Sequence, residues 1–190
     1  MTTLTPEATV DSVFQLLEAG SKQGYIGENI SQLEHALQAA LLAATARADE
    51  ETILAALLHD IGQFCSAKEL QRMLVEDLGQ DEIDLQGLKR SKDGSTNVGV
   101  MGHEKLGAEY LRKLGFSEKV CELVESHVVG KRYLTAVDEK YYEALSSASK
   151  LSLKFQGGPF SKEEAQRFET DPLFAQKVQL RKWDDAAEAR

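Results

Sequence analysis

A His-Asp pair, His59 and Asp60, lies within the strongly apolar segment LAALLHDIGQFC at residues 54–65. The apolar side chains of this segment fall on every side of a helical wheel, which predicts a helix that is buried all round. An isolated ionised carboxylate in such surroundings is strongly unfavourable unless it is paired with a charge or bound to a metal. Because both side chains are good metal ligands, we expect the chain to fold around a metal site.

Helix-capping residues recur along the chain and predict an all-α fold. Thr5 followed by Pro6 marks a helix start, Ser31 and Glu34 form a capping box, and Asp49 can cap the central helix. We find no convincing strand and no internal repeat. Helices are predicted over about 6–22, from 32, from 50, over 103–114, over 117–130, as one helix over 138–156, from 161 and from 171.

The length of 190 residues fits one domain, which we expect to span residues 1–190. Residues 78–102 lose all helical periodicity and are rich in Gly, Asp, Ser and Lys, which predicts a surface loop or lid inserted into that domain. The two cysteines, Cys65 and Cys121, stand alone in apolar contexts, so core packing is favoured over a disulfide framework.

The charge pattern argues against nucleic acid as a partner. The net charge is -9, from 31 acidic and 22 basic residues, and the basic residues form no sustained stripe. No apolar run reaches the length of a membrane span, and the N-terminus lacks the regions of a signal peptide. We therefore expect no membrane association and a cytoplasmic location.

The chain has four histidines, and each lies in or at the start of a predicted helix. Any one of them alone is more simply explained as a core or surface histidine. Together with two aspartates they fall on different predicted helices, which is how a helical bundle builds a metal site. Imidazole and carboxylate ligands suit iron, manganese, zinc or nickel. A bridging Asp60 could hold two metals roughly 3.5–4 Å apart. The six candidate ligands are His35, His59, Asp60, His103, His127 and Asp184.

This order of ligands resembles the HD-domain superfamily, whose signature has the form H…HD…H…H…D. The resemblance implies a helical bundle around a dinuclear metal site, with Asp60 as the bridging ligand. It assigns three residues to the first metal and two to the second. These are His35, His59 and Asp184 for the first, and His103 and His127 for the second.

Within the superfamily, the sequence is similar to the phosphonate-cleaving HD-domain oxygenases of the PhnZ/TmpB type, from about residue 13 to residue 184. The resemblance implies a mixed-valent Fe(II)/Fe(III) diiron enzyme that uses O2 as co-substrate to split the C–P bond of a 1-hydroxyphosphonate. The products would be phosphate and a carboxylic acid. The matching segments are QGYIGENISQLEH (23–35), LAALLHDIGQFC (54–65), GHEKLGAEYLRKLGFSEKV (102–120), HVVGKRYL (127–134), LSSASKLSLKFQGGP (145–159) and RKWDD (181–185).

The same resemblance implies roles for eight further residues around the substrate. Tyr25 would cover the second iron until substrate displaces it, and Glu28 would help to read the amino end of the substrate. Gln32 and Gln63 would line the site or hydrogen-bond its ligands, and Gln63 stands where close relatives have a histidine. The insertion around 69–98 is also longer than the family pattern. The residues matching phosphonate-binding positions are Lys131, Ser149, Ser152 and Arg181.

The implied substrate is 2-amino-1-hydroxyethylphosphonate or its trimethylammonium analogue, giving glycine or glycine betaine. A quaternary ammonium would need an aromatic face such as Tyr25 or a nearby acid such as Glu28. A separate phosphonate hydroxylase that supplies the hydroxyphosphonate is the expected pathway partner. Two alternatives remain open, namely an HD phosphohydrolase that acts without O2 and, ranked last, a non-catalytic HD regulatory domain.

Overall fold

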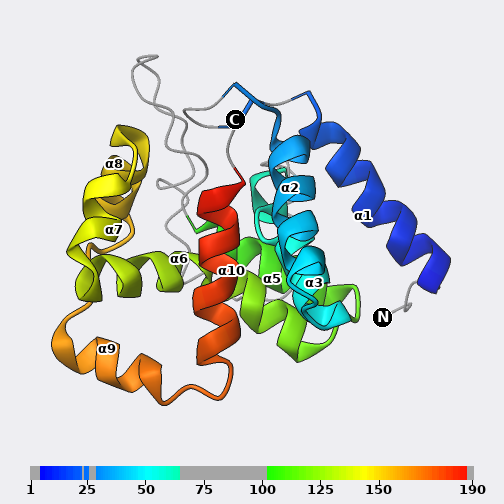
Figure 1. The fold of residues 1–190 in the computed structure, drawn as a ribbon. Helices are drawn as coiled ribbons and strands as arrows, with labels where there is room; N and C mark the ends of the chain where they lie inside the picture. Colours follow the sequence, from blue (N-terminus) through cyan, green and yellow to red (C-terminus); the bar gives the residue numbers. More distant parts are fainter. Residues whose placement is uncertain (1–4, 23, 26–28, 65–101, 188–190) are drawn as a thin grey trace, which may run out of the picture.

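The computed structural model describes residues 5–22, 24–25, 29–64 and 102–187, and these residues form helices without a β-strand (Figure 1). The expected all-α fold is confirmed. Among the described residues, no helix is long and apolar enough to cross a membrane. The helices are α1 (Pro6–Gly20), α2 (Gln32–Thr45), α3 (Glu50–Leu58), the short 3₁₀ helix η1 (Ile61–Gln63), α5 (His103–Lys113), α6 (Glu118–Val137), α7 (Glu139–Ala144), α8 (Ser147–Phe155), α9 (Lys162–Glu169) and α10 (Phe174–Ala186).

The predicted caps are in place because each satisfies a backbone N–H that the first helical turn leaves without a partner. Ser31 and Glu34 form a reciprocal capping box at the start of α2. The Asp49 carboxylate accepts a hydrogen bond from the Thr52 N–H at the start of α3. Gly115, with φ of 85°, follows the end of α5 in the left-handed conformation that suits glycine. The caps on α2 and α3 fix where these two helices begin. Helix α3 leads directly into the His-Asp pair.

Helix α6 is the central element, and it packs against α3, α5, α7, α9 and α10. Figure 1 shows α1 beside α2 on one flank and the α7–α9 segment on the opposite flank. The core between these flanks is aliphatic and fully buried, which is what holds the helices at fixed positions. Its largest apolar side chains are Leu58, Ile61, Leu111, Leu123 and Leu180.

Three predicted helix boundaries are wrong. Helix α3 ends at Leu58, so Asp60 lies in the turn before η1 instead of inside a helix. The expected helix over 138–156 is broken at Leu145, which is extended, because the Ser146 hydroxyl caps a new helix, α8. Helix α6 continues past Gly130 to Val137. This glycine permits a close approach to α10, since an added Cβ would lie 2.9 Å from Arg181 Cβ.

The predicted site lies where two groups of helices pack together. Helix α10 packs against α2, α3 and α6, and α5 packs against η1 and α6. The predicted lid falls on residues 78–102, of which only Gly102 belongs to the described part of the chain. Its conformation, and the single-domain boundary of 1–190, stay predictions.

Gly62 is required for the contact between η1 and α5. A Cβ at this position would lie 2.0 Å from the His103 carbonyl oxygen and 2.9 Å from the Gly107 nitrogen, so the backbone would have to shift. We predict that Gly62→Ala lowers stability by about 1–3 kcal/mol. It should also weaken binding of any metal held by His103. Thermal unfolding and metal content measure the two effects.

Gly24→Ala is the matched control, because no atom lies within 4 Å of the added Cβ and the residue is exposed. A melting temperature equal to the parent's for Gly62→Ala would contradict the close packing of η1 on α5.

Candidate metal centre

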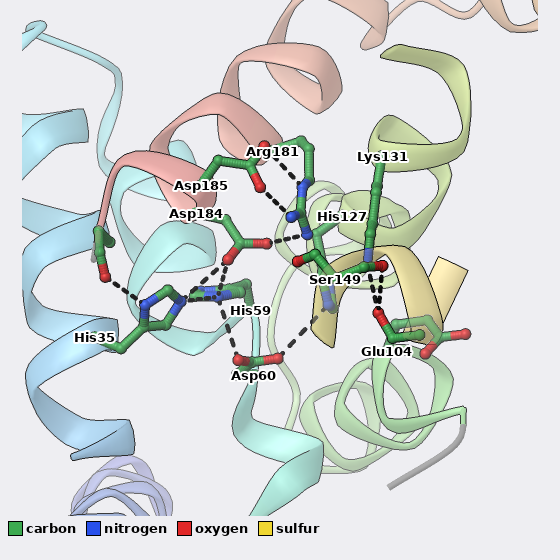
Figure 2. A network of polar contacts seen from close by, with 12 residues as sticks. His35, His59, Asp60, Glu104, His127, Lys131, Ser149, Arg181, Asp184 and Asp185 are labelled. Atoms are coloured by element: carbon green, nitrogen blue, oxygen red, sulfur yellow. Dashed lines mark hydrogen bonds and ion pairs between the residues drawn. The ribbon is translucent and has the colours of Figure 1, made fainter. Parts of the chain in front are cut away.

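Five elements bring the six predicted ligands to one place in the core (Figure 2). Figure 2 shows His35 on α2, His59 and Asp60 in the turn that follows α3, His127 on α6 and Asp184 on α10. His103 is the first residue of α5. All six are buried, with exposed fractions of 7 % or less. They form two clusters, each with ligand atoms within 4.8 Å of one another. One cluster is His35, His59 and Asp184, and the other is Asp60, His103 and His127.

In the first cluster the ligand atoms face a common point. His35 Nε2 lies 3.1 Å from Asp184 Oδ1 and 3.2 Å from His59 Nε2. His59 Nε2 lies 3.5 Å from Asp184 Oδ1. Three imidazole and carboxylate donors at these separations are the chemistry of a transition-metal site.

Asp60 stands between the two clusters, with one carboxylate oxygen toward each. Its Oδ2 lies 3.6 Å from His59 Nε2, and its Oδ1 lies 3.1 Å from His103 Nε2 and 3.6 Å from His127 Nε2. The two Nε2 atoms of His103 and His127 are 2.9 Å apart. This placement suits the predicted bridging role, because a carboxylate can give one oxygen to each of two metals.

The tautomers of three histidines are set by backbone carbonyl groups. His35 Nδ1 lies 2.6 Å from the Ala187 oxygen, and His59 Nδ1 lies 2.8 Å from the Ala56 oxygen. His127 Nδ1 lies 2.7 Å from the Val124 oxygen. A carbonyl oxygen only accepts, so each Nδ1 carries the proton and donates it, which leaves the Nε2 lone pair free for a metal.

The electrostatics of the cluster favour bound cations. Burial opposes the charged forms of Asp60 and Asp184, yet His59 on both, His103 on Asp60 and Arg181 on Asp184 hold both carboxyl pKa values well below their usual range. Burial would lower the His59 pKa, but Asp60 and Asp184 raise it to about 9. His127 behaves in the opposite way, because burial and then His103 lower its pKa to about 3. A bound metal ion would displace the proton from His59 and leave its imidazole neutral. Two buried carboxylates and neutral imidazole groups are then suitable ligands for metal ions.

A cavity of about 70 Å³ lies against the two clusters. Its lining combines metal-ligand candidates with basic, hydroxyl and amide side chains. Seven of the eight predicted substrate residues line it, whereas the eighth, Glu28, lies outside the described residues. The lining residues are Tyr25, Gln32, Asp60, Gln63, His103, His127, Val128, Lys131, Ala148, Ser149, Ser152, Gln156, Arg181 and Asp184.

Lys131 is a buried ammonium at one side of the cavity. Its Nζ donates to Ser152 Oγ at 2.6 Å, and Ser152 Oγ in turn donates to the Ser149 carbonyl oxygen at 3.0 Å. Burial, and then the nearby Arg181 guanidinium, lower the Lys131 pKa to about 8. Within the described part of the chain, the Lys131 ammonium donates only to the Ser152 hydroxyl, so an anionic ligand would balance its charge.

Arg181 is held in a fixed orientation beside the metal cluster (Figure 2). Its Nη1 donates to Asp184 Oδ2 at 2.6 Å, and its Nη2 donates to Asp185 Oδ1. Its Nε lies 3.1 Å from both Tyr141 Oη and Asp185 Oδ2. These bonds use three of the five guanidinium N–H groups, so one N–H on each of Nη1 and Nη2 is left to face a ligand.

Tyr25 lies against the first cluster. Its ring stacks on His35 with centroids 3.7 Å apart and an interplanar angle of 14°, and its hydroxyl donates to Asp184 Oδ1 at 3.4 Å. Burial and the Asp184 charge raise its pKa well above the usual value, so the phenol stays protonated. Its ring stacking and its hydroxyl hydrogen bond are both with residues of the first cluster. Its expected role as a gate at the second metal stays a prediction.

The sequence did not predict three polar residues that lie at the site. Gln156 lines the cavity from the end of α8, and Tyr141 and Asp185 hold Arg181. The spacing of Ser149, Ser152 and Gln156 on one helical face was the available signal for Gln156. No pattern in the sequence links Tyr141 on α7 to Arg181 on α10.

Comparison with known proteins shows to which family the chain belongs. The HD domain family model matches residues 33–153, which includes five of the six ligand candidates but not Asp184. The chain therefore belongs to the HD-domain family. It is 39 % identical over 186 residues to a hydroxymethylphosphonate dioxygenase of Gimesia maris, a match that covers 98 % of this chain and 81 % of the relative. Within the family it is an oxygenase of the PhnZ type.

Two further relatives match over most of the chain. An uncharacterised protein of Acanthamoeba polyphaga mimivirus is 37 % identical over 176 residues, covering 93 % of this chain and 71 % of the viral protein. A [1-hydroxy-2-(trimethylamino)ethyl]phosphonate dioxygenase (glycine-betaine-forming) of Leisingera caerulea is 34 % identical over 177 residues, covering 93 % and 79 %. Each of these matches is longer than the segment that the family model covers.

The two clusters predict a metal stoichiometry that can be dissected. We expect the parent protein to bind two Fe(II) ions per chain when loaded without O2. His35→Ala and His127→Ala should each lose one ion, from different clusters, whereas Asp60→Asn should weaken both sites because Asp60 faces both. Metal content after desalting measures this.

Asp11→Asn, an exposed carboxylate change on α1, is the control and should keep both ions. Loss of both ions in His127→Ala together with full retention in Asp60→Asn would contradict the arrangement.

Proposed function

We propose that this protein uses O2 to cleave the C–P bond of a small 1-hydroxyphosphonate, releasing phosphate and a carboxylate. The observation that carries the proposal is a pair of buried His/Asp clusters beside a small cavity that is lined by two buried cations, Lys131 and Arg181. The names of the two phosphonate dioxygenases above support the same chemistry. The reaction balances as R–CH(OH)–PO3²⁻ plus O2 giving R–COO⁻, HPO4²⁻ and H⁺.

The cofactor we propose is a pair of iron ions in the mixed-valent Fe(II)/Fe(III) state. His35, His59 and Asp184 would hold one ion, His103 and His127 the other, and Asp60 would bridge. When bound, the irons would supply the binding and reduction of O2, chemistry that no side chain of the cluster provides. The site residues and their roles are proposals that rest on the geometry described above.

The protein's own contribution is to bind and orient the phosphonate. The Lys131 ammonium and the two remaining N–H groups of Arg181 favour an oxyanion as the ligand. Guanidinium groups bind such oxyanions through paired N–H donors. Because Arg181 also holds Asp184, a phosphonate on Arg181 lies next to the first cluster. Ser149 and Ser152 would complete this end of the cavity. The reacting carbon is thereby held beside the metals.

The substituent on the reacting carbon distinguishes the candidate substrates. They are 2-amino-1-hydroxyethylphosphonate, its trimethylammonium analogue and, from the relative's name, hydroxymethylphosphonate. Tyr25 is the only aromatic side chain, apart from histidines, among the described residues that line the cavity. One face of its ring is already covered by His35. A hydroxylase upstream and a cytoplasmic location remain predictions.

The decisive test is O2 uptake measured together with phosphate release. We expect the iron-loaded protein to consume one O2 for each phosphate formed from a 1-hydroxyphosphonate, and Lys131→Met to lose most of this activity through a higher KM. Phosphate release from phosphate esters without O2, and no O2 uptake on any hydroxyphosphonate, would establish the alternative of a metal-dependent phosphohydrolase.

Tyr141 gives a second test, because it acts on substrate only through Arg181. Tyr141 Oη accepts from Arg181 Nε and donates to Asp185 Oδ2 at 2.5 Å. We predict that Tyr141→Phe raises the KM for the phosphonate about tenfold, the equivalent of one lost hydrogen bond to a charged group, with kcat little changed. Steady-state kinetics measure the split.

Tyr142→Phe is the matched control, since Tyr142 is 40 % exposed and its ring faces Lys150. An unchanged KM in Tyr141→Phe would contradict the role given to the Tyr141–Asp185 pair.

A further inference from the structure

Helix α8 forms one wall of the cavity but has little apolar packing of its own. It contributes Ala148, Ser149 and Ser152 to the lining, and Gln156 follows at its C-terminal end. Of its nine described residues only Leu153 is buried, and Figure 1 shows α8 on the outer flank of the molecule. Isolated helices shorter than about 12–15 residues are marginal in water. The position of this wall therefore depends on polar contacts as well.

Two consecutive basic residues of α6 supply such contacts. Lys131 Nζ donates to Ser152 Oγ at 2.6 Å, in the second half of α8. Arg132 Nε donates to the Gly158 carbonyl oxygen at 2.8 Å, and its Nη2 lies 3.5 Å from the Gly157 carbonyl oxygen. The lysine contacts the wall from the cavity side, whereas the arginine holds the chain directly after the helix ends.

Arg132 reaches these carbonyl groups because the chain turns sharply after α8. Gly157 and Gly158 have φ of 94° and 71°, in the left-handed region that suits glycine. The Gly158 N–H donates to the Leu153 carbonyl oxygen at 2.9 Å, which closes the end of the helix. The Phe160 ring packs against the Arg132 guanidinium, with Cζ 4.6 Å from the ring centroid, and the Phe160 N–H donates to the Arg132 carbonyl oxygen at 3.1 Å.

Arg132 differs from Lys131 because it is not among the described residues that line the cavity. Its ion pair with Glu164, with Nη2 3.3 Å from Oε1, is also outside the cavity lining. A ligand anion can therefore bind Lys131 without competing for the contacts of Arg132. An arginine suits this task, since its planar fork reaches several acceptors at once and stacks on an aromatic ring, which a lysine cannot do.

We propose that Arg132 is a positioning residue, which holds the C-terminal end of α8 against α6 and so keeps Ser149 and Ser152 in the cavity wall beside Lys131. The inference rests on the proposed function, because these three residues are the ones proposed to bind the phosphonate. Arg132 acts on the ligand only through this wall. It touches neither the candidate metal ligands nor the cavity.

Two substitutions separate the fork of Arg132 from its charge. Arg132→Met removes the charge and every donor, whereas Arg132→Lys keeps the charge and can donate to one carbonyl oxygen. We expect Arg132→Met to raise the Kd for methylphosphonate about tenfold, the equivalent of one lost hydrogen bond from a charged group, and Arg132→Lys to give an intermediate value. Calorimetry of the iron-loaded protein without O2 measures both. The KM of a hydroxyphosphonate should rise by the same factor, with kcat within twofold of the parent's.

Amide hydrogen exchange reports on the wall itself. Arg132→Met should speed exchange about tenfold within residues 147–156 and leave α2, α3 and α5 unchanged. Metal content should equal the parent's, because α8 supplies no residue to either cluster. Arg167→Gln, which removes an exposed positive charge from α9, is the matched control and should keep the parent's exchange and affinity.

Three results would overturn the inference. The first is full affinity in Arg132→Lys, since charge alone would then suffice. The second is exchange in Arg132→Met that is unchanged in α8 or faster in all helices alike, because the residue would then have no specific effect on the wall. The third is a parent protein that does not bind methylphosphonate. Measured O2 uptake decides the proposed function separately, so a protein that binds the phosphonate as expected but consumes no O2 would lose the proposed oxidation and keep this role of Arg132.

Discussion

The burial of two carboxylates is the constraint on which the rest of the structure depends. Asp60 and Asp184 are 6 % and 3 % exposed, and neither is stable there without positive charge or hydrogen-bond donors around it. Four helices and the turn after α3 bring the two carboxylates and the groups that stabilise them to one point in the core. The apolar packing of α3, α5, α6 and α10 holds these helices in place. The two buried carboxylates explain why polar residues are found between them.

Arg181 connects the metal cluster to the cavity. Its Nη1 donates to Asp184 and its Nε/Nη2 edge donates to Asp185, which leaves one N–H on each Nη for a ligand. In the proposed site, a ligand anion on Arg181 and a metal ion on Asp184 would be held by two side chains of one helix, α10. Gly130 allows α6 to approach this helix closely, which also brings Lys131 to the same cavity. The proposed orientation of the substrate would thus depend on the crossing of α6 and α10.

The sequence was sufficient to predict the helical class and the six residues that the structure brings together in two buried clusters. Four histidines in a chain of this length, each in a helical context, leave few ways to assemble a metal site. The caps of α2 and α3 were equally local, so they were predicted correctly. The passage of α6 through Gly130 was not, because it depends on packing against α10, and the break at Leu145, where the Ser146 hydroxyl caps a new helix, was missed as well. Tyr141 was missed because its role arises from a contact between α7 and α10, which are distant in the sequence.

The most direct measurement of the central claim is the origin of the oxygen atoms in the products. The iron-loaded protein would be given a 1-hydroxyphosphonate under ¹⁸O2 in ordinary water, and phosphate and carboxylate would be analysed by mass spectrometry. The account predicts that ¹⁸O from O2 is found in the products. Products that take their new oxygen only from water would contradict it and would identify the site as hydrolytic.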